Sequence, residues 1–318
     1  YNLYISVKFS YHTTCINMCI KNNLENIKTI VNTTNDIYNI IGNKLKYQLL
    51  ESTKVIKDLE YIETNNNGVN LKLYKTIIKN KEDFIPYIKF IAFIDYLVSI
   101  NTLMYNKYNL VTYTKNEPKL VITDFKHPFL DNSIPNSINI SNNKNIIITG
   151  PNASGKSTLI KSIIINILMA QTIGVSLSTE MTLTPFKNIY SFLNTNDILG
   201  SQSLFQTEIK NIGSYLNILK NKENSFIIVD EILKGTNHTE STKISSAICK
   251  KLNSVKNNIS IITTHNNILT NLEKTNDSTN YKMELNTYKL NKGISTDFLG
   301  IEILKKSNFD KDIINSII

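Results

Sequence analysis

The sequence predicts an α/β protein with a mostly parallel sheet, preceded by an all-α region. Residues 1 to about 110 are nearly free of glycine and proline and have a helical pattern. From about residue 118, short β-type runs alternate with helical segments, as in a parallel sheet covered by helices. A glycine-containing loop, TGPNASGKST at 149–158, stands between one such run and a helix. The length suits two domains, which we expect at 1–115 and 116–318.

The first domain is expected to contain a break at TNNNGVN, 64–70, followed by further helix. Its most apolar stretch, 87–105, contains Lys89 and Asp95. These two residues, Ser99, Thr102 and Asn106 recur at helical spacing. We therefore expect a mostly buried amphipathic helix rather than a bilayer span, and no membrane association.

The second domain contains five runs typical of strands. They are KLVIT at 119–123, NIIIT at 145–149, IYSFL at 189–193, SFIIVDE at 225–231 and the run 259–265. Pro118, Pro128 and Pro135 mark the junction between the two domains.

The loop after NIIIT has the spacing of a phosphate-binding loop: Gly150, four residues, then Gly155-Lys156-Ser157. Glycines let backbone N–H groups approach phosphates, and the N-terminus of the following helix favours negative charge. Lys156 is expected to reach the β- and γ-phosphates, and the Ser157 hydroxyl to ligate Mg²⁺. The alternative, a plain strand-to-helix turn, explains neither Lys156 nor Ser157. The expected nucleotide-binding residues are Gly150, Pro151, Asn152, Ala153, Ser154, Gly155, Lys156, Ser157 and Thr158.

Two carboxylates end the run SFIIVDE, and ligands of parallel sheets bind at the carboxyl ends of strands. Asp230 is expected to hold Mg²⁺, and Glu231 to act as the general base on water. His265 ends the next strand-like run, where it could contact the γ-phosphate or the attacking water. The alternative for His265 is a surface residue that ends a strand, which its position one strand after Asp230 and Glu231 disfavours.

A second anion site is conceivable at GSQSLFQTEI, 200–209, because Ser201 and Ser203 precede a helical stretch. The alternative is an ordinary helix N-cap with Glu208 inside the helix. The residues alone leave both readings open.

The chain carries a formal charge of +9, and all 35 of its basic residues are lysine. This balance fits nucleic-acid binding, although a coding bias toward Asn, Ile and Lys produces it equally well. No arginine finger is available, so any cationic assistance must come from lysine. Cys15, Cys19 and Cys249 form no disulfide framework, and we expect an intracellular, reducing compartment.

Taken in order, these motifs resemble the ATPase domain of the MutS family of DNA mismatch-repair proteins. TDFKHPFLDNSIPNSI resembles the family's Arg-His-Pro region, with Lys126 in place of the arginine before His127-Pro128. NDILGSQSLFQTEIKNI resembles the signature segment, and VDEILKGTNHTES the Asp-Glu strand with its Gly-Thr loop. ITTHNNILTNL resembles the histidine switch, and 285–317 the closing hairpin and helix. The signature has Gly200-Ser201 where the family usually has Ser-Gly.

The resemblance implies an ABC-type P-loop ATPase domain behind an all-α lever and core region. It implies ATP and Mg²⁺ as cofactors, Ile134 near the adenine, and Ser203 acting in trans on the partner's nucleotide. It implies mismatched or branched DNA as a partner and a dimer, either a homodimer or a heterodimer with a MutS-like partner. The expected activity is DNA-dependent ATP hydrolysis in mismatch repair or recombination. Two alternatives remain: a DNA-structure-binding clamp without mismatch specificity, and an ABC-type ATPase that does not act on DNA.

Overall fold

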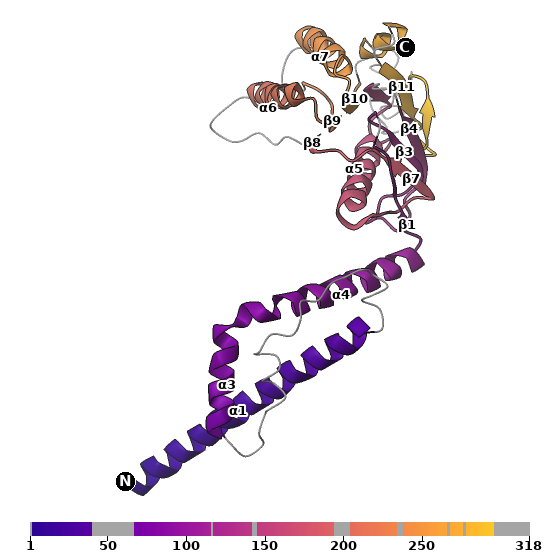
Figure 1. Cartoon of the computed structure of the whole chain (residues 1–318). Coiled ribbons are helices and arrows are strands. Elements are labelled where there is room, and N and C mark those ends of the chain that lie inside the picture. Colours follow the sequence, from indigo (N-terminus) through magenta and orange to yellow (C-terminus); the bar gives the residue numbers. More distant parts are fainter. Residues whose placement is uncertain are drawn as a thin grey trace, which may run out of the picture. The chain divides into compact units, whose positions relative to one another are not determined.

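The computed structural model describes residues 2–39, 67–115, 117–141, 145–193, 204–233, 238–265, 268–275 and 278–295. The chain divides into two compact units, Tyr1–Asn101 and Thr102–Ile318. The described part of the first unit is helical, and the strands lie in the second (Figure 1). The expected domain boundary near residue 115 stays a prediction.

The first unit contains α1 (Asn2–Ile37), α3 (Asn67–Lys79), the short 3-10 helix η3 (Lys81–Phe84) and all but the last turn of α4 (Ile85–Tyr105). Apolar side chains of α1 recur every three or four residues, so they form one stripe that packs against α3. The buried members of this core are Ile20, Leu24, Val31, Leu73, Ile77 and Tyr87. The expected break at 64–70 is wrong for its last four residues, because α3 begins at Asn67, where Asn and Gly are tolerated at a helix N-terminus.

Helix α4 differs from its expectation, because it is not mostly buried. Only Tyr87 and Phe90 are buried, while apolar residues such as Ile88 and Val98 are 62% and 59% exposed. Apolar residues occur all round this helix, so no single face gathers them against a neighbour. Its length and mean hydropathy of 1.3 would by themselves suffice to cross a membrane. Asp95 at its middle argues against a span, because a carboxylate at the bilayer centre is costly.

The main sheet of the second unit has the strand order β12-β11-β5-β10-β9-β8. Its first five strands in the chain are parallel and β12 is antiparallel at one edge. The predicted α/β class is therefore confirmed. The strands are β5 (Asn145–Thr149), β8 (Asn188–Phe192), β9 (Ser225–Asp230), β10 (Asn258–Thr263), β11 (Ser278–Met283) and β12 (Leu290–Lys292).

A second sheet has the order β2-β7-β3-β4, and a short antiparallel pair joins β1 to β6. The predicted strand at 119–123 is confirmed as β3, whereas β4 was missed because its Asn and Ser residues resemble a loop. In the structure the strand alternates between buried and exposed residues: Ser137 and Asn139 point outward, whereas Asn136 is buried with Ile138 and Ile140. The bounds are β1 (Asn109–Leu110), β2 (Thr112–Tyr113), β3 (Leu120–Phe125), β4 (Asn136–Ile140), β6 (Val175–Ser176) and β7 (Glu180–Leu183).

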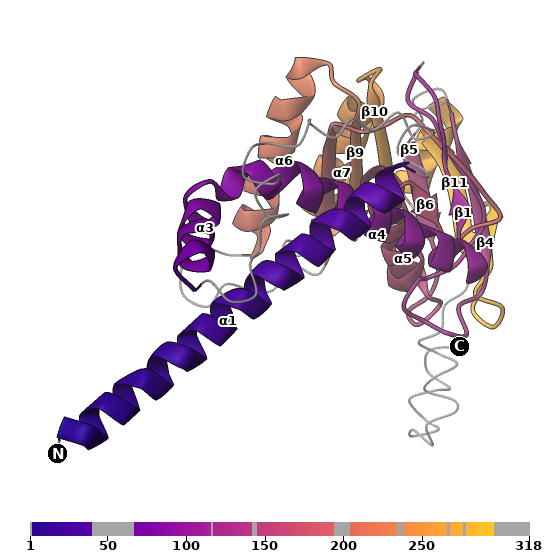
Figure 2. The ribbon, with the colours of Figure 1, turned by 60° about the horizontal axis from the view of Figure 1, so that its bottom comes forward.

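The two faces of the main sheet bury different partners. Ile146 and Ile148 of β5 face a core shared with the second sheet and with α5 (Lys156–Ile173). Ile147, which lies between them and points the other way, belongs to a core shared with α6 (Leu204–Ile218) and α7 (His238–Asn253). Figure 2 shows α6 and α7 next to β9 and β10. The short 3-10 helices η4 (Leu219–Asn221) and η5 (Leu269–Thr275) complete this layer.

Candidate nucleotide-binding site

The loop between β5 and α5 favours glycine at two positions. A Cβ on Gly150 would lie 2.8 Å from the Oγ of Ser154 and 3.1 Å from the Cβ of Met283. Gly155 has φ +90°, a left-handed conformation that disfavours other residues. A Cβ there would also approach the ring of Tyr288 at 3.1 Å. The loop is therefore pressed against β11 and the turn that follows it, and Gly155 caps the N-terminus of α5.

Lys156 is folded back over this loop and is 7% exposed. Its Nζ donates hydrogen bonds to the carbonyl oxygens of Gly150 at 2.8 Å and Pro151 at 2.9 Å. A buried ammonium needs such partners, because desolvation without them costs several kcal/mol, on the order of the values for buried ions. The loop thus holds a fixed positive charge beside the N-terminus of α5.

Asp230, at the end of β9, accepts a hydrogen bond on each carboxylate oxygen. Ser157 Oγ donates to Oδ2 at 2.7 Å and Thr263 Oγ1 donates to Oδ1 at 2.7 Å. Thr263 was not predicted from the sequence, and it takes part because β10 lies between β5 and β9 in the sheet. The only sequence signal was the run TTH at 263–265.

Glu231 follows Asp230 in the chain and has a left-handed backbone, with φ +59°. Its backbone N–H donates to Thr263 Oγ1 at 3.0 Å, so one hydroxyl orients both acidic residues. Its Oε1 lies 2.8 Å from Nε2 of His265, and the two side chains are 32% and 40% exposed. His265 is therefore not an isolated surface residue. The left-handed backbone of a non-glycine residue is costly and is typical of functional sites.

A cavity of about 840 Å³ joins these groups at the carboxyl ends of β5 and β9. The expected site residues that line it are Ile134, Asn152, Ala153, Gly155, Lys156, Ser157, Thr158, Asp230, Glu231 and His265. Gly150, Pro151 and Ser154 shape the loop without lining the cavity. Met283 and Tyr288, which were not predicted from the sequence, also line it.

Asn136 connects two segments that line this cavity through hydrogen bonds. It was not predicted from the sequence as a site residue. Its Oδ1 accepts a hydrogen bond from the N–H of Leu290 at 2.7 Å, and its Nδ2 donates to the carbonyl of Tyr288 at 3.0 Å. The side chain is 7% exposed. It thereby fixes the segment that contains Ile134 against the turn that contains Tyr288.

The segment before Ile134 is organised around His127. Nδ1 of its ring accepts a hydrogen bond from the backbone N–H of Phe129 at 3.2 Å, and the backbone N–H of His127 donates to Ser133 Oγ at 2.8 Å. Burial, and secondarily the charge of Lys161, lower the pKa of His127. The neutral ring is the form that can accept the hydrogen bond from Phe129.

The donor set fits a nucleoside triphosphate with Mg²⁺. Lys156 and the α5 N-terminus suit phosphate oxygens, and the Ser157 hydroxyl with the Asp230 carboxylate suits Mg²⁺, which is usually held by one or two carboxylates together with substrate phosphates. Within the described ranges, no group of three or more His, Cys, Asp or Glu residues is placed to hold a metal ion. Ser203, the segment Lys234 to Asn237 and residues 296–318 lie outside the described residues.

Comparison with known proteins gives a consistent result. The family model of MutS domain V matches residues 146–317. The DNA mismatch repair protein MutS of Thermotoga sp. (strain RQ2) is 31% identical over 283 residues, covering 83% of this chain and 35% of the relative. MutS of Fusobacterium nucleatum subsp. nucleatum is 32% identical over 214 residues, covering 62% of this chain and 24% of the relative.

The DNA mismatch repair protein MSH3 of Saccharomyces cerevisiae is 29% identical over 226 residues, covering 64% of this chain and 22% of the relative. The chain thus spans roughly a quarter to a third of the length of these curated relatives. A family match over more than half of the chain, with about 30% identity over most of it, leaves one conclusion: the chain is a divergent member of the MutS family.

Proposed function

We propose that this chain binds ATP with Mg²⁺ and hydrolyses it, as the ABC-type P-loop ATPase part of a MutS-type DNA-binding protein. The observation that carries the proposal is that Lys156, Ser157, Asp230, Glu231 and His265 line one cavity. They come from three separate segments of the chain. If the loop served only as a strand-to-helix turn, these five side chains would not be expected to line the same cavity.

The phosphates are held by the loop residues 150–158 and by Lys156. The Lys156 ammonium exchanges carbonyl partners for phosphate oxygens, which are stronger acceptors because they are charged. Ser157 and Asp230, whose side-chain oxygens lie 2.7 Å apart, would hold Mg²⁺. When bound, Mg²⁺ would neutralise part of the negative charge of the phosphates. Ile134 and Tyr288 also line the cavity, and we expect the base of the nucleotide to lie near them.

Glu231 is placed to take the proton from a water molecule. Its carboxylate is half-buried in the same cavity, and its backbone is fixed by Thr263. His265 lies 2.8 Å from that carboxylate and positions it, and it is expected to reach the γ-phosphate. With no arginine in the chain, cationic help within the chain comes from lysine and from the α5 N-terminus.

Substitution of Glu231 tests this assignment. Glu231→Gln keeps the size of the side chain, so nucleotide binding should persist while hydrolysis falls about a hundredfold, on the order of the contribution of a general base. Lys156→Ala should instead weaken binding itself. Binding is measured with a fluorescent ATP analogue and hydrolysis by phosphate release. Near-normal turnover of the Glu231 variant would remove the proposed role.

DNA binding and dimer formation belong to the same proposal. The relatives are named DNA mismatch repair proteins, and the chain carries a charge of +9. We expect ATPase stimulation by DNA, an affinity that falls steeply with salt, and an ATP-dependent dimer whose second copy lends the segment beginning at Ser203.

Stimulation by mismatched but not matched duplex indicates mismatch repair. Stimulation by branched DNA alone indicates a clamp without mismatch specificity. No stimulation and no binding at low salt would leave an ATPase that does not act on DNA. Light scattering with and without ATP tests the dimer.

A further inference from the structure

A second cavity lies at the other end of the main sheet, before the amino ends of β9 and β10. Its volume is about 590 Å³. It is formed where α6 passes through η4 toward β9, and where α7 ends before β10. We call it the basic groove, and its defining residues are Lys220, Lys222, Lys251, Lys256, Leu216 and Val255. It shares no residue with the nucleotide cavity.

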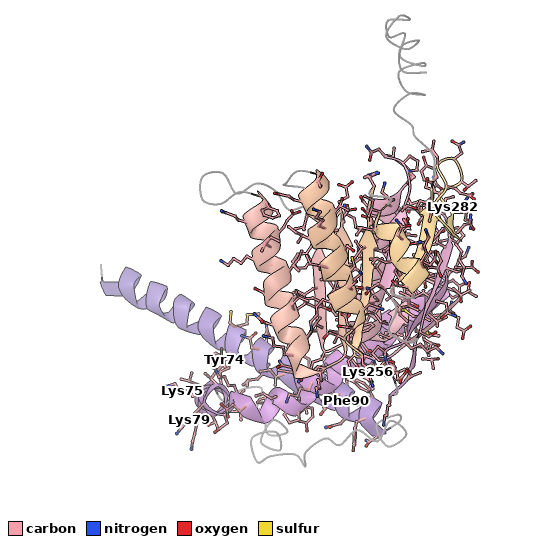
Figure 3. All side chains as sticks on the ribbon, turned by 90° about the horizontal axis from the view of Figure 1, so that it is seen from above. Tyr74, Lys75, Lys79, Phe90, Lys256 and Lys282 are labelled. Atoms are coloured by element: carbon pink, nitrogen blue, oxygen red, sulfur yellow. The ribbon has the colours of Figure 1, made fainter. Side chains whose placement is uncertain are left out.

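All charged residues that line the basic groove are positive. The four lysines are exposed, and none of the residues that line the groove is acidic. Within the part of the chain that the structure describes, none of the four makes an ion pair. The neighbouring Glu223 is paired with Lys187 instead. Figure 3 shows Lys256 where α7 ends.

Helix polarity explains part of this pattern. Lys251 in the last turn of α7 and Lys220 in η4, which follows α6, complement the negative ends of the helix dipoles. Stabilisation of helix dipoles does not, however, explain why lysines from separate elements line the same cavity. Like charges so arranged repel one another unless an anion lies between them.

The floor of the basic groove is apolar. Leu216 and Val255 are half-buried, and Leu219 beneath them is 4% exposed and belongs to the core under α6 and α7. The phosphates and sugars of a nucleic-acid backbone are polar, so they would gain little from contact with these apolar side chains. Phosphate sites are typically built from helix N-termini, whose N–H groups point at the ligand, whereas two helix C-termini meet here. A ligand with an apolar side chain flanked by carboxylates would match both the apolar floor and the lysines around it.

We propose that the basic groove binds an acidic segment of a partner protein. One apolar side chain of that segment packs on Leu216, Leu219 and Val255, and its carboxylates pair with the lysines. The volume lies within the range of about 300–1,000 Å³ found for ligand sites, enough for a short peptide. The site is separate from the nucleotide cavity, so its occupation does not require ATP.

The test uses the whole chain and a short fluorescein-labelled peptide in which Leu and Phe alternate with Asp and Glu. Fluorescence anisotropy at low salt should show saturable binding. Replacing Lys220, Lys251 and Lys256 together by Gln should weaken it on the order of tenfold, as three partly screened ion pairs would. A peptide with Ser in place of Leu and Phe should also bind more weakly, and so should the chain carrying Val255→Thr.

The matched control removes the same charge from Lys115, Lys210 and Lys243, of which the last two lie on α6 and α7 outside the groove. This control should bind the peptide like the unmodified chain, and the thermal midpoints should show all variants to be folded. The proposal is overturned if both triple variants bind equally weakly, or if the Ser peptide binds as well as its parent. It is also overturned if no peptide binds, or if duplex DNA displaces the peptide from the groove.

Discussion

At the scale of single residues, one hydroxyl organises the acidic end of the nucleotide site. Thr263 donates to Asp230 and accepts from the N–H of Glu231, so it sets the direction of both residues. It is fully buried at the end of β10. A methyl group in place of this hydroxyl would remove one hydrogen bond from each acidic residue.

Thr263→Val tests this arrangement with almost no change of volume. It leaves Asp230 Oδ1 and the Glu231 N–H without their shared partner, at a cost of about 1–3 kcal/mol in the free energy of unfolding. ATP hydrolysis should fall at least tenfold, roughly, since 1.4 kcal/mol in the barrier is a factor of ten. Thr182→Val on β7, in the other sheet, is the control. Equal activity of the two variants would contradict the role of Thr263.

Two cysteines are predicted to differ in reactivity. Burial raises the pKa of Cys249 to about 12, whereas Cys19 is exposed. Because the thiolate is the reactive form, a thiol reagent at pH 8 should modify Cys19 and leave Cys249 unmodified. Mass spectrometry of digested protein measures both, and guanidinium should make Cys249 reactive. Equal labelling in the folded protein would show that α7 opens readily.

At the scale of elements, the start of α5 depends on a left-handed glycine. Gly155→Ala forces a side chain to φ +90° and places its Cβ 3.1 Å from the Tyr288 ring. We expect a loss of about 1–2 kcal/mol in the free energy of unfolding, the cost of a left-handed non-glycine residue, and weaker nucleotide binding. Urea denaturation and the fluorescent ATP analogue measure the two effects.

Gly213→Ala is the matched control within α6. A Cβ there meets nothing within 4 Å, and alanine has the higher helix propensity by about 1 kcal/mol. This variant should therefore be slightly more stable and bind nucleotide normally. If both substitutions destabilised the protein alike, the special geometry of Gly155 would not be the cause.

The loop from His127 to Ser133 should respond to pH. Burial lowers the pKa of His127 below its ordinary 6.5 in the folded protein. The unfolded chain thus binds the proton more readily, and stability rises with pH in this range. The contribution of His127 should be complete above pH 6.5 and be lost as the pH falls through the folded pKa. His127→Asn cannot titrate, so urea denaturation should show a smaller loss of stability between pH 7 and pH 5 for this variant.

At the scale of the whole molecule, the nucleotide site belongs to one unit. Its residues, and both cores that flank the main sheet, lie within Thr102–Ile318. We expect a fragment that begins after α4, at residue 106, to fold and to bind the fluorescent ATP analogue like the whole chain. Circular dichroism and titration measure this. A fragment that is unfolded, or folded but unable to bind, would show that residues 1–105 complete the site.

The sequence by itself determined the features that depend on consecutive residues. The strand, the glycine loop and the start of α5 follow from residues 145–158, because local backbone geometry is encoded by neighbours in the chain. The same holds for Asp230 and Glu231 at the end of an apolar strand. The burial of α4 was mispredicted because its polar spacing says nothing about how many neighbours it meets.

Only the tertiary structure decided which distant residues share the site. Ser157 reaches Asp230 across 73 positions, and Asn136 reaches Leu290 across 154. Thr263 enters because β10 pairs between β5 and β9, and Tyr288 enters because its turn presses on Gly155. These contacts follow from the order of strands in the sheet. That order minimises the free energy of the whole fold, and no short segment contains it.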